Sequence, residues 1–137
     1  MKIFKVKEIV SGECSGEPFI VGHKISFFGE VDPSKGIIRG YGGSFKDKVL
    51  IIPGTRGSTV GSYIIYALKE YDTAPKCIVV GEAEPILIVG CILSNIPLLE
   101  VIDFNDLIDY IRSSNGYVVY RRDLGGLVVE ERYSNSY

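Results

Sequence analysis

The chain has 137 residues, 46% of them hydrophobic, so it is long and apolar enough to bury the core of one domain spanning residues 1–137. Its 17 acidic and 15 basic residues give a net charge of −2 without a basic stripe, which argues against a nucleic-acid partner. No apolar run reaches the ~18 residues that a membrane span needs, and the charged, alternating N-terminus is unlike a secretion signal. We therefore expect a cytoplasmic protein with no membrane contact.

The three cysteines and the single histidine are scattered along the chain. Cys14, Cys77 and Cys91 form no Cys-x-x-Cys pair, and His23 lies in an expected turn, where a site role stays open. We expect no metal site built by this chain alone. Cys77 and Cys91 lie in apolar runs, and we interpret them as small buried hydrophobic residues. A chain with this equipment is suited to be a binding module or one part of a larger enzyme.

The first half of the chain predicts β structure. Alternation over residues 3–10 and a short apolar run at 17–21 are typical of strands. Residues 25–35 begin apolar and end in a turn, and the glycine-rich residues 36–45 predict a strand edge followed by a loop. The continuous apolar run 48–53 predicts a strand buried on both faces.

The pattern changes after Pro53 to a helical period. Residues spaced for one helix face follow: Val60, Tyr63, Ile64, Ala67 and Leu68. Residues 77–80 predict another buried strand. Residues 82–95 suit either a helix or a strand, and we favour a helix because Pro85 fits a first helical turn preceded by glutamates.

The last third predicts a strand, a short helix and a hairpin. The strand is residues 97–102, and the helix is 103–116 with Asp103 as N-cap and Gly116 as C-cap. Residues 117–131 predict a hairpin that turns at 123–126. The central strand–helix–strand–helix–strand order predicts parallel strands with right-handed crossovers, and the β-rich ends predict an antiparallel sheet beside them. The fold class is therefore α/β.

The segment PGTRGSTVGSY, residues 53–63, connects a predicted strand to a predicted helix. Such a turn brings backbone N–H groups and the positive end of a helix dipole to one place. Gly54 and Gly57 let the backbone approach a ligand, Ser58 or Thr59 is placed to cap the helix, and Arg56 suits a carboxylate or phosphate. The segment lacks the lysine of a P-loop and the spacing of a dinucleotide fingerprint.

Two interpretations of this segment stay open. It is either an ordinary capped turn, with Ser58 as N-cap and Arg56 on the surface, or an anion site. Ser58 and Ser62 lie four residues apart and share one helix face. A serine among N–H donors and beside Arg56 gains a stabilised alkoxide and can then act as a base.

Three segments, ISFFGEVDP, PGTRGSTVGSY and GEAEPI in this order, resemble the small subunits of archaeal phosphomevalonate dehydratases. These belong to the aconitase X family and correspond to the swivelling domain of aconitase-like enzymes. The resemblance covers residues 11–101, with RGSTVGSY as its most specific part. Glu30 stands where the family pattern has a glycine, and residues 103–137 match least.

The resemblance implies a swivelling β/β/α domain that pairs with a large subunit carrying an iron–sulfur cluster of the 4Fe-4S type. Together they would dehydrate (R)-5-phosphomevalonate to trans-anhydromevalonate 5-phosphate in the archaeal mevalonate pathway. The proton acceptor would be Ser58, with Ser62 as second choice. The residues expected to bind the substrate are Arg56, Gly57, Thr59 and Ser62.

Two neighbouring segments also have alternative interpretations. Phe27 and Phe28 form either part of a plain turn or an exposed aromatic pair at the subunit interface or active-site mouth. Glu82 and Glu84 are either helix-terminal acids or residues that orient Arg56 or face the large subunit. Competing functions are a non-catalytic anion-binding or regulatory module, a structural subunit that completes another enzyme's cleft, and a dehydratase of another hydroxy acid such as hydroxyproline.

Overall fold

Runs of four apolar residues form the centre of the fold. In the computed structural model, which describes residues 2–57 and 59–131, β7 (Val49–Ile52) and β8 (Cys77–Val80) are parallel and every one of their residues is buried. A strand buried on both faces needs no polar alternation, which is why the sequence shows continuous apolar runs here. Both strands were predicted at these places.

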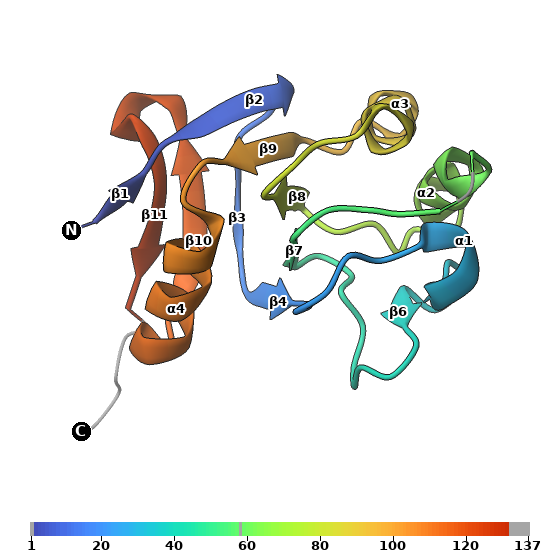
Figure 1. The fold of residues 1–137 in the computed structure, drawn as a ribbon, viewed down its shortest axis with the longest axis horizontal. Helices are drawn as coiled ribbons and strands as arrows, with labels where there is room; N and C mark the ends of the chain where they lie inside the picture. Colours follow the sequence, from blue (N-terminus) through green and yellow to red (C-terminus); the bar gives the residue numbers. More distant parts are fainter. Residues whose placement is uncertain (1, 58, 132–137) are drawn as a thin grey trace.

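The central sheet has the order β2-β9-β8-β7-β4 in the described part of the chain. Strands β4 (Pro18–Ile20), β7, β8 and β9 (Leu98–Val101) are parallel, and β2 (Val6–Val10) pairs antiparallel with β9. Helices α2 (Gly61–Glu70) and α3 (Pro85–Ser94) connect the parallel strands and cover one face of the sheet (Figure 1). The predicted parallel core with helical crossovers is confirmed, and residues 82–95 contain the favoured helix with Pro85 in its first turn.

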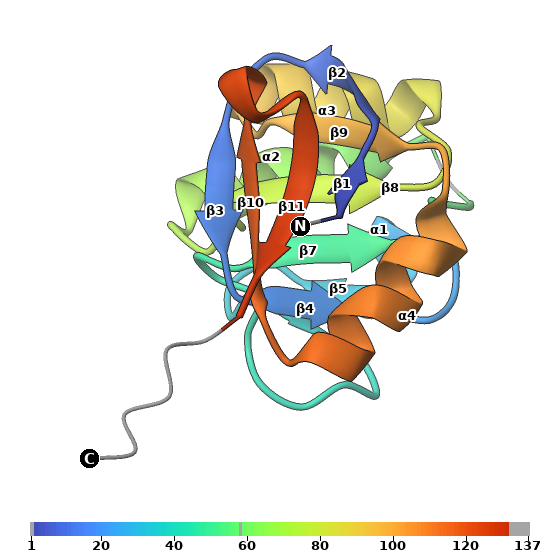
Figure 2. The ribbon, with the colours of Figure 1, turned by 90° about the vertical axis from the view of Figure 1, so that its left-hand side faces the viewer.

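A second sheet covers the opposite face. Its order is β1-β11-β10-β3, all antiparallel, with β1 (Ile3–Phe4), β11 (Gly126–Glu130), β10 (Tyr117–Arg121) and β3 (Cys14–Gly16). Figure 2 shows its strands running across those of the central sheet, with α4 (Phe104–Ser114) beside it. The layers are therefore helices, sheet and sheet, the β/β/α arrangement that the family resemblance implies.

Smaller elements complete the fold. Helix α1 (Phe27–Glu30) is a single turn, β5 (Val31–Asp32) pairs with β6 (Ile37–Ile38), and a 3-10 turn η1 (Arg122–Leu124) closes the hairpin of β10 and β11. The hairpin was predicted. The single strand predicted at residues 3–10 is instead divided between the two sheets, because β1 pairs with β11 and β2 with β9.

The two layers on either side of the central sheet have separate hydrophobic cores. Leu50 and Ile52 of β7 belong to the core under the helices, and Val49 and Ile51 to the core between the sheets. This division follows from the period of two in a strand, which points successive side chains to opposite faces. Gly90 of α3 is needed where the helices meet, since a Cβ there would lie 2.6 Å from Ile65 Cδ1.

The two sheets are also joined covalently, which corrects the interpretation of Cys77. Cys77 of β8 forms a disulfide with Cys14 of β3, 63 residues away in the sequence. Cys91 is a buried free thiol as predicted, and burial raises its pKa to about 12. The cysteine pair was missed because nothing in its spacing indicates that β3 crosses β8.

Helix faces and caps differ in detail from the predictions. In α2 the buried residues are Gly61, Ile65 and Leu68, whereas Tyr63, expected on the buried face, is 74% exposed. Helix α4 has Asp103 at its N-cap position without a capping side-chain hydrogen bond, and Asn115, with a φ of 51°, is its C-cap instead of Gly116. Asparagine adopts the left-handed conformation at low cost, so it ends the helix one residue earlier. Among the described residues, no helix is both long and apolar enough to cross a bilayer.

Candidate functional site

The segment that follows β7 meets the segment that follows β8 at one edge of the central sheet. The carbonyl of Pro53 accepts the N–H groups of Gly81 and Glu82, each at 3.1 Å. Helices α2 and α3 begin directly beyond these segments. Ligands of parallel sheets bind at the carboxyl ends of the strands, and this edge is such a place.

The loop after β7 is held against residues just before α1. Ile25 N–H donates to the Gly54 carbonyl at 3.2 Å, and Arg56 N–H donates to the Ile25 carbonyl at 2.9 Å. Gly57 then has a φ of +97°, where a side chain is strained, and a Cβ at this position would lie 3.0 Å from Ser26 Oγ. The glycine predicted to allow a close approach is therefore required by the loop itself.

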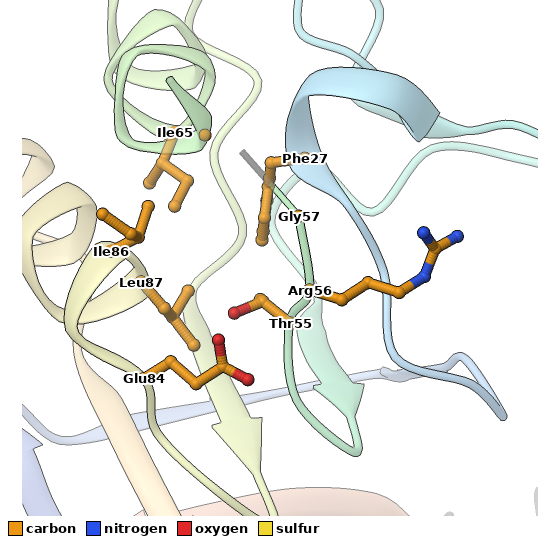
Figure 3. Close-up of a pocket in the computed structure, with 9 residues that line it drawn as sticks. Phe27, Thr55, Arg56, Gly57, Ile65, Glu84, Ile86 and Leu87 are labelled. Atoms are coloured by element: carbon orange, nitrogen blue, oxygen red, sulfur yellow. The ribbon is translucent and has the colours of Figure 1, made fainter. Parts of the chain in front are cut away.

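A small cavity of about 20 Å³ lies between this loop, α1, α2 and α3 (Figure 3). Its walls combine apolar side chains with the polar side chains of Thr55 and Glu84, which point toward one another. The apolar lining is Phe27, Gly61, Ile65, Ile86 and Leu87. This volume holds about one water molecule, so a ligand with two anionic groups must lie mostly outside it.

Two helix N-termini converge on the cavity. Gly61 is the first residue of α2, Ile86 is the second residue of α3, and both line the cavity. Each helix has 10 residues, so each directs the positive end of a dipole toward this place. Val60 occupies the N-cap position of α2 and makes no capping side-chain hydrogen bond, so Thr59, one of the two predicted caps, is not the N-cap. Ser58, the other predicted cap, lies outside the described residues.

Arg56 points away from the cavity toward its rim (Figure 3). Its Nε donates to the Lys24 carbonyl and one terminal nitrogen donates to Glu30, both at 3.3 Å, while 60% of its side chain remains exposed. The carboxylate that contacts Arg56 therefore belongs to Glu30. Neither Glu82 nor Glu84, the two residues considered for this role, has a described contact with Arg56.

Glu30 joins several groups at this rim. Its carboxylate accepts the Ser26 N–H at 2.6 Å and lies 2.9 Å from His23 Nε2, and the other ring nitrogen of His23 is 3.1 Å from Tyr41 Oη. The Ser26 N–H, then the His23 hydrogen bond and also the charge of Arg56 hold the pKa of Glu30 below its ordinary value. His23 thus lies at the edge of the site, as one of its open interpretations allowed.

The structure brings together some of the predicted site residues. Arg56 and Gly57 contribute to the cavity, whereas exposed Thr59 and half-buried Ser62 are not among its lining residues. The Ser62 hydroxyl donates to the Thr59 carbonyl at 3.5 Å. Ser58, the predicted proton acceptor, lies outside the described residues.

Sequence reasoning missed most of the cavity wall. One of the two interpretations had Phe27 exposed together with Phe28, but Phe27 is only 3% exposed and lines the cavity, while Phe28 is 61% exposed. In a helical turn adjacent residues point in different directions, so a pair cannot share one surface. Thr55, 7% exposed, was also missed, although its place between Gly54 and Arg56 was a usable signal.

The described residues include no group of three or more His, Cys, Asp or Glu side chains able to hold a metal ion. Two of the cysteines are joined in the disulfide and the third is a buried protonated thiol. These cysteines do not fit an iron–sulfur cluster, which requires accessible thiolates.

Comparison with known protein sequences finds relatives that share one name. A phosphomevalonate dehydratase small subunit from Pyrococcus abyssi is 50% identical over 107 residues, covering 74% of this chain and 78% of the relative. The protein of the same name from Thermococcus onnurineus is 42% identical over 132 residues, covering 93% of this chain and 98% of the relative. The one from Methanosarcina mazei is 40% identical over 121 residues, covering 85% and 83%.

Comparison with solved structures and family models agrees. The crystal structure of Thermococcus kodakaraensis aconitase X in its holo-form matches with a TM-score of 0.81 and 37% identity, covering 96% of this chain and all of the matched chain (100%). The family model described as the aconitase X swivel domain matches residues 3–128. The chain therefore belongs to the aconitase X swivel-domain family.

Proposed function

We propose that this chain is the small subunit of a cytoplasmic hydro-lyase that converts (R)-5-phosphomevalonate to trans-anhydromevalonate 5-phosphate. The relatives named above are phosphomevalonate dehydratase small subunits, and a small subunit implies a large one. The chain spans most of their length. The partner would be a large subunit that carries the 4Fe-4S cluster, because the cysteines of this chain do not fit one.

The observation that supports the proposal is a small cavity bordered by two helix N-termini. The two helix starts and the loop of Arg56 line a cavity that holds about one water molecule, and the Arg56 guanidinium lies at its rim. Phosphomevalonate has a carboxylate and a phosphate, and both suit these positive groups. Because so little of the substrate fits into the cavity, we assign the remaining walls of the site to a second polypeptide.

The proposed contribution of this chain to the reaction is a base and charge stabilisation. The proton leaves the carbon next to the carboxylate, and Ser58 is the proposed acceptor, with Ser62 as second choice. Negative charge then develops toward the carboxylate, where the dipoles of α2 and α3 would stabilise it without rearrangement. The cluster, when bound to the large subunit, supplies a Lewis acid for the departing hydroxyl.

Exposed apolar side chains on α1 and α3, two helices that border the cavity, support a partner on this side of the chain. Phe28 projects from α1 beside buried Phe27, and α3 exposes further apolar residues along its length. These are Val89, Ile92 and Leu93. Neighbouring exposed apolar side chains along one helix are suited to a contact with another protein. We assign this side of the chain to the large subunit.

The proposal is tested by Ser58→Ala in the reconstituted two-subunit complex, assayed with phosphomevalonate. Loss of a general base lowers kcat by roughly 10²–10⁴-fold, and size-exclusion chromatography should show an intact complex. Ser62→Ala tests the second choice, and we expect it to lose less activity than Ser58→Ala. If the large loss of kcat occurs in Ser62→Ala and not in Ser58→Ala, the base is Ser62.

Two results would contradict the proposal. Full activity of both serine variants would indicate a structural subunit that only completes a cleft. Turnover of hydroxyproline but not of phosphomevalonate by the unmodified complex would assign the chain to another dehydratase.

A further inference from the structure

We infer that Glu30 is a positioning residue that holds the Arg56 guanidinium at the cavity rim as the binding point for the substrate anion remote from the reacting carbon. The inference rests on the proposed function, since it needs a substrate with a second anionic group. It is drawn from the junction of Glu30 with Arg56, Ser26 and His23, which hydrogen bonds hold together.

The Glu30 carboxylate is itself held in place by the turn of α1. The Ser26 hydroxyl oxygen accepts the Gly29 N–H at 3.3 Å, and the Glu30 carboxylate accepts the Ser26 N–H at 2.6 Å. This reciprocal pair resembles a capping box and leaves the side chain little freedom. His23 Nε2, 2.9 Å away, contacts the second oxygen. The contacts with Ser26 and His23 therefore fix the orientation of the Glu30 carboxylate independently of Arg56.

Arg56 is constrained at both ends. Its N–H donates to Ile25, its Nε donates to Lys24, and one terminal nitrogen donates to the Glu30 oxygen that also accepts the Ser26 N–H. The two side-chain contacts use two of the five N–H groups of a guanidinium, so donors remain for a ligand. The depressed pKa of Glu30 keeps its carboxylate charged at neutral pH.

The direction of the Arg56 side chain indicates that it acts in substrate binding and not in the chemical step. The backbone of Arg56 adjoins Gly57 in the loop, but its side chain leads away from Thr55, Ile86 and Leu87 toward α1 (Figure 3). A cation placed there contacts a remote group of the substrate equally in the ground state and the transition state. Such uniform binding lowers KM and leaves kcat unchanged.

The test compares Glu30→Gln with Asp32→Asn in the two-subunit complex. Glutamine keeps an acceptor for the Ser26 N–H but loses the charge that holds Arg56. We expect KM for phosphomevalonate to rise roughly fivefold with kcat within a factor of two, and Arg56→Ala to raise KM more. Asp32→Asn changes a nearby carboxylate that contacts Ser34, so its kinetics should match the unmodified complex.

A double-variant cycle separates positioning from a general structural effect. If Glu30 acts through Arg56, the double variant with Glu30→Gln and Arg56→Ala has the same KM as Arg56→Ala alone. The inference is overturned if the two effects multiply, if KM falls in Glu30→Gln because the carboxylate competes with the substrate, or if kcat falls while KM stays constant. Unchanged kinetics in Glu30→Gln would overturn it as well.

A binding measurement keeps the inference testable without turnover. Calorimetric titration of the complex with inorganic phosphate should show weaker binding in both Glu30→Gln and Arg56→Ala than in the unmodified complex. An inactive complex with this order of affinities would refute the proposed substrate and support the positioning role. Equal phosphate affinity in all three would refute the positioning role.

Discussion

The two faces of the central sheet are held by different kinds of contact. On the face toward the antiparallel sheet, the Cys14–Cys77 disulfide joins the layers, and Glu8 of β2 binds Arg122 through two bonds of 2.7 and 2.9 Å. On the face toward the helices, the loop after β7 is held at its rim by Arg56, 60% exposed, and Glu30. Covalent and ionic links between sheets add stability, whereas polar contacts of an exposed rim leave donors for a ligand. Changes on the two faces should therefore separate stability from activity.

The largest expected effect is on the disulfide. Cys14→Ser opens a link between residues 63 apart in the sequence, which lowers the free energy of unfolding by about 4 kcal/mol in the chain-entropy model. Turnover of the assembled complex should stay the same, because the bond lies on the face away from the cavity. Urea unfolding measures the first and a steady-state assay the second. A stability change below about 1 kcal/mol would contradict the contrast between the faces.

The two adjacent phenylalanines sharpen the contrast within one turn. Phe27→Ala removes a buried wall of the cavity and should lower the free energy of unfolding by about 3 kcal/mol. Phe28→Ala should leave the unfolding of the isolated chain unchanged and weaken its affinity for the large subunit roughly tenfold. Thermal unfolding and a titration of the two subunits distinguish the variants. If Phe28→Ala binds the large subunit as tightly as the unmodified chain does, Phe28 and its face are not part of the interface.

Gly57→Ala tests the loop directly. Its φ of +97° and the 3.0 Å approach of a new Cβ to Ser26 Oγ should cost about 1–2 kcal/mol of stability and displace the loop. We expect kcat to fall much more than the fraction of folded protein does, because the displaced loop belongs to the site. Gly22→Ala is the matched control, since a Cβ there meets no atom within 4 Å. Similar activity in both variants would show that loop geometry is unimportant.

The smallest expected effect is the contribution of Glu8 to the free energy of unfolding, which depends on pH. Bonds from Arg122, then from Tyr120, lower the pKa of Glu8 from 4.5 to about 2. Its stabilising contribution is therefore complete above pH 4.5 and is lost as the pH falls from 4.5 through 2. Glu8→Gln should cost about 1 kcal/mol at pH 7, since solvent screens the half-exposed arginine, and progressively less below pH 4.5. Unfolding curves at several pH values check this, and a difference independent of pH would contradict it.

The sequence by itself determined the local elements and the class of fold. Apolar runs at β7 and β8, the helical period after Pro53, and Pro85 at the start of α3 are short-range patterns, and each appears where it was predicted. The sequence also indicated the segment 53–63 and its family. These features depend on residues close to one another in the chain, so their physics can be read locally.

Only the tertiary structure decided the contacts between distant segments. Cys14 meets Cys77 because β3 crosses the central sheet, and Glu30 meets Arg56, 26 residues away, because α1 packs beside the loop after β7. Tyr63, expected on a buried helix face, is exposed, and Phe27, exposed in one interpretation, is buried. The reason is the same, since packing between helices selects which side of each helix is covered. Periodicity specifies that a face is buried, but the neighbour that buries it follows from the arrangement of the whole chain.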